Sequence, residues 1–357
     1  MSDPASRPPL KPMRPVPRGT RAGFFRGRYK ESPADFEVEE VPAYEPSGRG
    51  DHVWMWIEKR SLSTIDLLHE LAHAVGCDER ALGIAGLKDA QAVSRQWVSL
   101  EHADEARCAA AAGERFRVLR TSRHGNKLRM GHLRGNRFGV VLRGTGPDDL
   151  AKAQTALAEL ERLGVPNYFG EQRFGKRGAN LQKGLDVLRG DARQFAARMP
   201  RRVFGLVISA VQSEVFNRVV AARRAGVHQL LAGDLAFLHK NGAVFPVEDL
   251  AREQARAATF ELSPSGPMPG PEMPDPTGEP LRLEQQALAE LDLPRRAFDR
   301  LPFRLGRGER RALRVPVEAA TATAVDGGLK LCFTLPRGAY ATAVLRELLT
   351  DTIWFAG

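Results

Sequence analysis

The sequence predicts an α+β protein in which a domain built around a mixed sheet is interrupted by a more helical one. Residues alternate between apolar and polar, as strands do, at several places before position 143 and again near 326–335, whereas helical patterns cover 207–224 and 283–291. At 357 residues the chain is also longer than one ordinary core requires. We therefore expect two domains, one of them built from both ends of the chain.

The expected organisation begins with a flexible, basic, proline-rich tail, because prolines among basic residues form neither helix nor sheet ladder. The expected segments are residues 1–20 for the tail, 21–165 and 305–357 for the sheet-containing domain, and 166–304 for the helical insertion.

The elements of the first domain follow from local patterns. Strands are expected at 36–40 and 52–57. A helix should begin at the capping box of Ser63 and Asp66 and end at Gly76. The other expected elements are strands around 96–100, 138–142 and 329–335, a hairpin turn at 326–328, and helices at 148–163 and 340–349. Lys88 and Asp89 then fall on a loop between buried elements.

The net charge of +10 and the pI near 9.9 indicate a polyanionic partner. Much of the excess, however, lies in residues 1–28, which leaves 46 basic against 42 acidic residues elsewhere. A basic tail fits a nonspecific nucleic-acid arm or plain solubility equally well, so charge alone supports RNA binding only weakly.

The composition, 43% hydrophobic and 27% charged, is typical of a soluble globular protein. No apolar run approaches the roughly 20 residues that span a bilayer, and the N-terminus has no signal-like apolar block. A cytoplasmic protein without membrane contact is expected. Cys77, Cys108 and Cys332 show no CxxC spacing, which suggests neither a zinc site nor a disulfide framework.

The loop that carries Asp89 stands out through its neighbours, because a lone loop aspartate is usually a turn former or a helix cap. Gly86-Leu87-Lys88-Asp89, followed by Ala92-Val93 and Gln96-Trp97, resembles the signature around the nucleophilic aspartate of the TruD pseudouridine synthases. The block from Asn167 to Gly175 resembles the most recognisable motif of that family, although it could equally be packing at a domain junction.

Three more segments resemble the family in order and approximate spacing. They run from Lys30 to Glu40, from His124 to Arg143, and from Leu335 to Leu348. The resemblance therefore extends collinearly from about residue 22 to 350.

The resemblance implies a pseudouridine synthase-like catalytic domain with a mixed, mainly antiparallel sheet, interrupted by an α-rich TRUD domain. It also implies an isomerase that converts uridine to pseudouridine in tRNA, at position 13, with neither a metal nor an organic cofactor. The sequence agrees in lacking a metal-ligand cluster and a phosphate-cradling glycine-rich loop.

In this interpretation Asp89 is the nucleophile, since a carboxylate that is ionised at neutral pH can attack carbon and later leave. A nearby cation favours that charged form. The resemblance points to Lys30 as the charge partner, with a solvated lysine before a proline turn as the alternative. Lys88 would face away in an extended segment.

The resemblance also points to residues that bind the extruded base. Asn136 is expected to hydrogen-bond the base edge or to hold the Asp89 loop, and Phe138 to line the pocket unless it is a core residue. Tyr340 is expected to stack on the base, where the family usually has Phe, and its hydroxyl either relays the C5 proton or reaches solvent. The general base at C5 is therefore left open.

Two alternatives to the enzyme remain at this point. One is a catalytically inactive or RNA-chaperone-like tRNA-binding protein of the same fold; the other is a generic basic α/β enzyme with accidental motif matches. The predicted partner is tRNA. By analogy the protein should be a monomer without an obligate protein partner.

Overall fold

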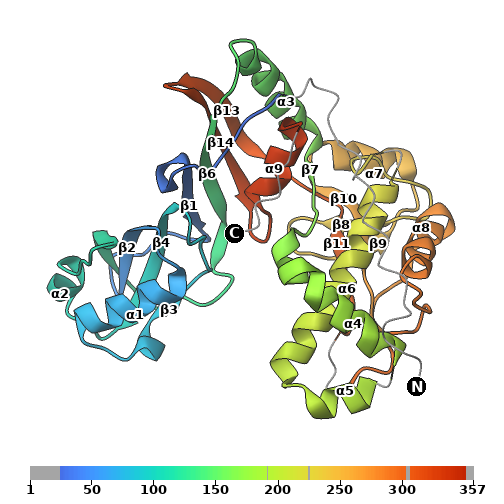
Figure 1. The fold of residues 1–357 in the computed structure, drawn as a ribbon, viewed down its shortest axis with the longest axis horizontal. Helices are drawn as coiled ribbons and strands as arrows, with labels where there is room; N and C mark the ends of the chain where they lie inside the picture. Colours follow the sequence, from blue (N-terminus) through green and yellow to red (C-terminus); the bar gives the residue numbers. More distant parts are fainter. Residues whose placement is uncertain (1–24, 191, 224–225, 303–305, 351–357) are drawn as a thin grey trace. The chain divides into compact units, whose positions relative to one another are not determined.

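The computed structural model describes residues 25–350 apart from 191, 224–225 and 303–305, and it leaves out the side chains of residues 171 and 172. The chain folds into two compact units (Figure 1). The split unit combines Thr20–Glu161 with Pro316–Gly357, and the inserted unit contains Arg162–Val315. The expected tail, 1–20, lies outside the described residues.

The units meet along the chain at 161/162 and 315/316, whereas the predicted domain boundaries lie at 165/166 and 304/305. Two short strands of the inserted unit, β7 (Val165–Pro166) and β12 (Arg314–Val315), pair with each other and join the incoming and outgoing chain. The predicted boundaries remain a prediction.

The split unit is built on an eight-stranded sheet with the order β13-β14-β6-β1-β4-β2-β5, to which β3 adds by pairing with β4. Its strands are β1 (Phe36–Pro42), β2 (His52–Arg60), β3 (Gly83–Ile84), β4 (Val93–Glu101), β5 (Phe116–His124), β6 (Leu133–Arg143), β13 (Glu318–Val325) and β14 (Gly328–Pro336). Only β1 and β4 pair in parallel; the other pairs are antiparallel. The predicted mixed, mainly antiparallel sheet is therefore confirmed.

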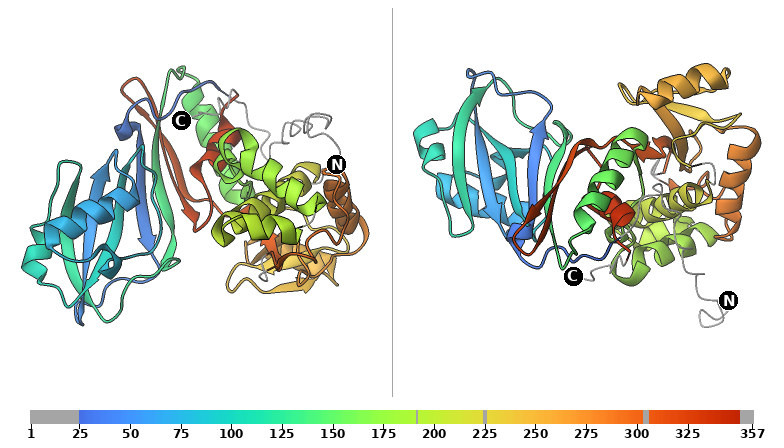
Figure 2. Two further views of the ribbon diagram at one scale, coloured as in Figure 1. Left: turned by 60° about the horizontal axis from the view of Figure 1, so that its bottom comes forward. Right: turned by 90° about the horizontal axis from the view of Figure 1, so that it is seen from above.

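The helices of this unit cover the sheet. They are α1 (Thr64–Val75), α2 (Glu105–Ala109), α3 (Asp149–Leu163) and α9 (Ala341–Leu348), with short 3-10 turns η2 (Pro33–Asp35) and η3 (Glu79–Ala81). The Ser63 hydroxyl caps α1 by accepting from the Asp66 amide, and Gly76 ends the helix in the left-handed conformation, as predicted. Helix α3 runs beside β13 and β14 (Figure 2), where the Gln154 amide donates to the Ala322 carbonyl.

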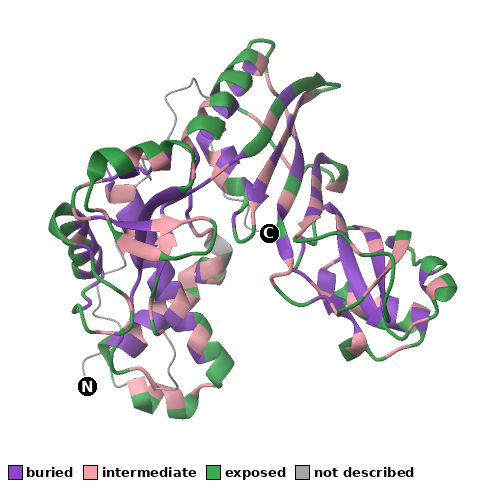
Figure 3. Ribbon diagram, turned by 180° about the vertical axis from the view of Figure 1, so that it is seen from behind, coloured by how far each residue is buried: buried purple, intermediate pink, exposed green. Residues whose placement is uncertain are grey.

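The core of the split unit follows from strand alternation. Val53, Met55 and Ile57 of β2 are fully buried and pack against Leu67 and Leu71 of α1. The central strands β2 and β4 are accordingly largely buried, whereas the edge strand β13 and the outer faces of the helices are largely exposed (Figure 3).

The inserted unit is rich in helices, but it also contains a four-stranded sheet with the order β11-β10-β8-β9. Its helices are α4 (Ala179–Arg189), α5 (Ala192–Arg198), α6 (Arg201–Ala222), α7 (Leu250–Ala258) and α8 (Gly278–Ala289), and its 3-10 turns are η4 (Glu171–Phe174) and η5 (Lys176–Gly178). The sheet consists of β8 (Leu235–Leu238), β9 (Val244–Pro246), β10 (Leu262–Met268) and β11 (Glu309–Ala312).

This sheet was not predicted from the sequence, because β10 contains Pro264 and Pro267 and is buried along its whole length, so it lacks the alternation typical of a strand. Pairing along β10 changes partner partway: Leu262–Pro264 pair with β8, and Ser265–Met268 pair with β11. Pro264 still contributes as an acceptor, since its carbonyl accepts from the Leu313 amide at 2.8 Å. A proline is tolerated in a strand where no ladder donor is required of it.

Helix α6 is the core of the inserted unit. Among the described residues it alone is long and apolar enough to cross a membrane by length and composition, and 72% of that apolar window is buried inside the fold. Its Phe204, Val207, Val211 and Phe216 are fully buried in one hydrophobic cluster. Packing inside the unit thus accounts for its apolar composition.

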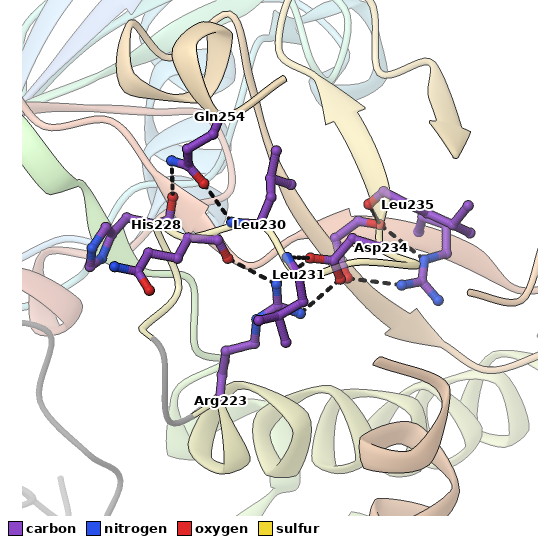
Figure 4. A network of polar contacts seen from close by, with 10 residues as sticks. Arg223, His228, Leu230, Leu231, Asp234, Leu235 and Gln254 are labelled. Carbon is purple, nitrogen blue, oxygen red and sulfur yellow. Dashed lines mark hydrogen bonds and ion pairs between the residues drawn. The ribbon is translucent and has the colours of Figure 1, made fainter. Parts of the chain in front are cut away.

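A buried polar network fixes the chain that leaves α6 (Figure 4). The Arg223 guanidinium forms an ion pair with Asp234, and both side chains are almost completely buried. Asp234 also accepts from the Leu231 amide, and the Gln254 side chain bridges the Leu230 amide and the His228 carbonyl. These contacts pair two buried charges that would be costly if left apart.

The close approach of β6 and β14 yields a test of the sheet register. A Cβ added at Gly135 would lie 2.2 Å from the Leu335 carbonyl oxygen, which is backbone and cannot move aside cheaply. We expect Gly135→Ala to lower the free energy of unfolding by about 2 kcal/mol, measured by urea denaturation. Gly139→Ala is the matched control, because its Cβ would meet the flexible end of Lys330 at 3.3 Å. Equal effects of the two substitutions would contradict the register.

Candidate active site

The loop that carries Asp89 lies over one face of the split-unit sheet. Strand register places a row of side chains on this face, with neighbours on adjacent strands: Lys59, Ser94, Val38, Phe138 and Phe333. The Lys59 ammonium donates to the Asp89 carbonyl at 2.9 Å, and the Ser94 hydroxyl lies 3.5 Å from the same oxygen. The backbone of Asp89 is therefore held against the sheet.

The Asp89 carboxylate has a partner at each oxygen. The Lys30 ammonium forms an ion pair with Oδ2, and the Gln91 amide donates to Oδ1 at 3.2 Å. About a third of the Asp89 side chain, 34%, remains exposed. The carboxylate is thus fixed in orientation yet open on one side.

Lys30 reaches Asp89 from a backbone segment that is held at both ends. Before it, Arg28 and Arg143 exchange backbone hydrogen bonds of 2.9 and 2.7 Å. After it, the Asp35 carboxylate accepts from the Arg143 guanidinium at 2.7 Å and from the Ser32 amide at 3.0 Å. Burial would raise the pKa of Asp35, but these hydrogen bonds outweigh it and lower that pKa below its usual value.

The conformation of Lys30 is itself unusual. Its φ of 62° lies in the left-handed region that non-glycine residues seldom adopt. The ammonium lies 4.2 Å from the centroid of the Phe36 ring, a cation–π contact that adds to the ion pair with Asp89. A strained residue held this firmly indicates a functional constraint.

Lys59 is a site residue that the sequence analysis missed. Its side chain is only 1% exposed, and it also donates to the Leu62 carbonyl. Burial lowers the pKa of Lys59 from 10.5 to about 8; the Asp89 charge opposes this shift and the Lys88 charge adds to it. The available signal was its position, because Lys59 continues the inward-facing alternation of Val53, Met55 and Ile57.

Lys88 turns away from the Asp89 carboxylate and pairs with Glu40 at 2.6 Å, where both side chains are buried. Burial raises the pKa of Glu40, and the Lys88 ammonium works against that rise. The Lys88 amide donates to the Thr64 hydroxyl, which in turn donates to Gln96 Oε1 at 3.1 Å. These contacts join the Asp89 loop to β1, β4 and the start of α1.

Asn136 and Phe138 lie on this same face of β6, opposite Glu40 and Val38 of β1. The Oδ1 atom of Asn136 is buried and has no hydrogen-bond partner among the described residues. Such an unsatisfied acceptor is rare in proteins and suits a ligand donor. Phe138 is 6% exposed and packs at ring distances of 6.2 Å from Phe36 and 5.6 Å from Phe333, so much of it serves the core.

Tyr340 is in the same unit but is not joined to Asp89. It precedes the first residue of α9, and its side chain is exposed. No hydrogen bond, ion pair or ring contact links Tyr340 to Asp89 within the described part of the chain. Tyr29, by contrast, lies within electrostatic range of Asp89: burial raises the pKa of its hydroxyl, and the Asp89 charge adds to that rise. No local sequence pattern points to Tyr29.

The Asn167–Gly175 block lies in the inserted unit. Phe169 exchanges two hydrogen bonds with the Asn217 side chain of α6, at 2.9 and 3.0 Å, and its ring contacts the Arg173 and Arg311 guanidinium groups. Arg173 also donates to the Ser213 hydroxyl at 3.1 Å. The block therefore packs against the core helix of this unit.

No group of three or more His, Cys, Asp and Glu side chains that could hold a metal ion is found in the described ranges. The acidic and basic groups around Asp89 are instead paired with one another. The chemistry open to this site is nucleophilic or electrostatic action by the Asp89 carboxylate beside the Lys30 ammonium.

Comparisons with known proteins agree with this architecture. A family model described as tRNA pseudouridine synthase D (TruD) matches residues 20–204 and 196–348. Relatives named tRNA pseudouridine synthase D include one from Anaeromyxobacter sp. (strain Fw109-5), 45% identical over 90% of this chain and 92% of its own length. Another, from Geobacter metallireducens (strain ATCC 53774 / DSM 7210 / GS-15), is 40% identical over 90% of this chain and 95% of its own.

A solved structure shows the same fold. A crystal structure from Methanosarcina mazei, provisionally described as tRNA pseudouridine synthase D (TruD), superposes with a TM-score of 0.80 at 21% identity and covers 94% of this chain and 96% of its own. Fold and family model together define the class as a pseudouridine synthase fold. The chain belongs to the TruD family.

The buried position of Lys59 predicts a pH dependence of stability. Its pKa is about 8 in the folded protein and near 10.5 when unfolded, so between these values the unfolded state binds more protons and stability rises with pH. Between pH 8 and 10.5, the free energy of unfolding of the native protein should rise by on the order of 3 kcal/mol relative to that of Lys59→Met.

Unfolding by urea, followed by tryptophan fluorescence, measures this difference, because Trp54, Trp56 and Trp97 lie on strands β2 and β4 of the split unit. Lys152→Met is the control, since Lys152 is a partly exposed lysine of the same unit that pairs with Asp149. A native-minus-variant difference that stays constant with pH would show that Lys59 is not desolvated.

Proposed function

We propose that this protein converts uridine to pseudouridine in tRNA, at position 13 in the D stem, with Asp89 as the nucleophile. The observation that carries the proposal is the Asp89 carboxylate, oriented by Lys30 and by the Gln91 amide on an otherwise anchored loop. The relatives named tRNA pseudouridine synthase D support the reaction type and the tRNA substrate.

The reaction breaks the bond between uracil N1 and ribose C1′ and forms a bond between C1′ and C5. The C5 proton is lost and N1 gains one, so the product is an isomer and no redox partner is required. Asp89 either attacks carbon or assists glycosidic cleavage and then leaves. Lys30 orients the carboxylate and balances its negative charge while the base excludes water.

The uracil base must leave the RNA stack to reach Asp89, which costs a few kcal/mol. Asn136 supports binding through its buried, unpaired Oδ1, which is suited to accept from the N3–H of uracil. Phe138 forms part of the pocket wall, and Tyr340 stacks on the base from the exposed rim. Either the Tyr340 hydroxyl or another group takes the C5 proton.

Further proposals concern the setting of the reaction. Neither a metal ion nor an organic cofactor takes part, the protein acts as a monomer in the cytoplasm, and no obligate protein partner is needed. The domain that binds the reacting uridine is formed by residues 21–165 and 305–357.

Replacing the nucleophile should abolish the reaction and spare binding. We expect Asp89→Ala and Asp89→Asn to lower tritium release from tRNA labelled at uridine C5 by more than about 10³-fold, as loss of a nucleophile does. The tRNA affinity should change little. Asp326→Asn, in the hairpin turn between β13 and β14, is the control.

Chemical mapping of pseudouridine in the product tRNA tests position 13 separately. Pseudouridine found only at another position would refute the proposal of position 13 but not the proposed pseudouridine synthase activity. A native protein that binds tRNA but releases no tritium would favour the inactive, RNA-chaperone-like alternative.

Removing the charge partner should act on chemistry more than on binding. We expect Lys30→Met to lower kcat by about 10-fold or more, because the carboxylate loses the cation that orients it and balances its charge. The KM for tRNA should change less. Lys152→Met, which removes a lysine from another aspartate ion pair of the unit, should leave kcat unchanged. A Lys30→Met variant with full kcat would refute the role of the ion pair.

A further inference from the structure

The Asp89 loop and two loops near it each expose an apolar side chain. Leu87 is 61% exposed, Met130 is 64% exposed and Tyr340 is 47% exposed. The first lies two residues before Asp89, and the others lie before β6 and after β14. Large apolar side chains left in solvent beside a candidate active site are typical of a surface that becomes covered on binding.

Hydrogen bonds hold the three loops together. The Gly131 amide donates to the Ala85 carbonyl at 2.8 Å, which joins the Met130 loop to the Asp89 segment. Arg337 donates from its guanidinium to the Gly131 carbonyl at 3.2 Å and from its amide to the Arg134 carbonyl at 3.0 Å, which joins the Tyr340 loop. The Met130 loop makes one more contact, because the Tyr44 hydroxyl lies 3.0 Å from His132 Nδ1.

The charge of this surface fits RNA. Arg129 and Arg337 are exposed beside Met130 and Tyr340, and Asp89 is the only acidic residue in segments 85–89, 129–132 and 337–340. Within the described chain the Arg129 side chain forms no hydrogen bond or ion pair, and the Arg337 guanidinium is held only by the Gly131 carbonyl. Arginines with unoccupied donors around apolar side chains match phosphates on either side of unstacked bases.

We propose that Leu87 and Met130 form a wedge that packs against the two bases flanking the extruded uridine, while Arg129 and Arg337 contact the adjacent phosphates. This inference rests on the proposed function, because it assigns an RNA role to the surroundings of Asp89. Apolar side chains placed between base steps compensate for lost stacking. Unstacking then becomes less unfavourable before the uridine reaches Asn136 and Asp89.

The double variant Leu87→Ala/Met130→Ala tests the wedge on two substrates. One is native tRNA; the other is the same tRNA with abasic nucleotides on both sides of the target uridine, where no base remains for the wedge to contact. Both residues are exposed, so the fold should be retained, which tryptophan fluorescence of the split unit verifies. Leu119→Ala is the control, since Leu119 is 42% exposed on β5.

We expect the double variant to lose on the order of 10-fold or more in kcat/KM on native tRNA, and to match the native protein within about twofold on the abasic substrate. Leu119→Ala should behave as the native protein on both. An equal loss on both substrates, or no loss on native tRNA, overturns the wedge. A native protein that forms no pseudouridine in either RNA would overturn the proposed function instead.

Discussion

The geometry around Asp89 depends on two buried lysines, each of which needs hydrogen-bond or ion-pair partners for its ammonium group. Lys59 and Lys88 have almost no contact with solvent, and a buried charge is tolerated only where it is paired or fully hydrogen-bonded. Lys88 meets this need through Glu40 of β1, and Lys59 meets it through two carbonyls, one of them that of Asp89. Moving the loop would leave one of these charges unsatisfied. The same contacts leave the Asp89 carboxylate available for Lys30 and for a substrate.

Much of the split unit could be predicted from the sequence because its signals are local. The alternation in β2, the cap at Ser63 and the left-handed Gly76 specify their elements without reference to the rest of the chain. The sheet of the inserted unit could not be predicted in this way. Strand β10 is fully buried along its length and carries two prolines, so it shows neither alternation nor ordinary strand composition. Its existence depends on partners that change at Ser265, which is tertiary information.

The site could be predicted only in part. Collinear motifs located Asp89, Lys30 and Asn136 in the sequence, but the Lys30–Asp89 ion pair and the buried, unpaired Oδ1 of Asn136 are set by register and by long-range pairing. Lys30 adopts its left-handed φ in a segment whose two ends are held by Arg143, more than a hundred residues away, and no local pattern signals it. Lys59 was overlooked because a lysine at the end of a strand ordinarily faces solvent. Sequence resemblance shows which residues occupy the motif positions. The backbone conformation of Lys30 and the burial of Lys59 depend on residues distant in sequence.

The pairing of β14 with β6 has a consequence for how the chain folds during synthesis. These strands are neighbours over nine residue pairs, yet about 190 residues separate them in sequence, with the whole inserted unit between. One edge of strand β6 therefore stays unpaired until the C-terminal segment has been synthesised, because contacts so distant in sequence form late. An unpaired strand edge is a template for association with other chains. A ribosome-bound chain that ends before β14 would thus have an incomplete sheet. The nascent chain would be most prone to aggregation at this stage of synthesis.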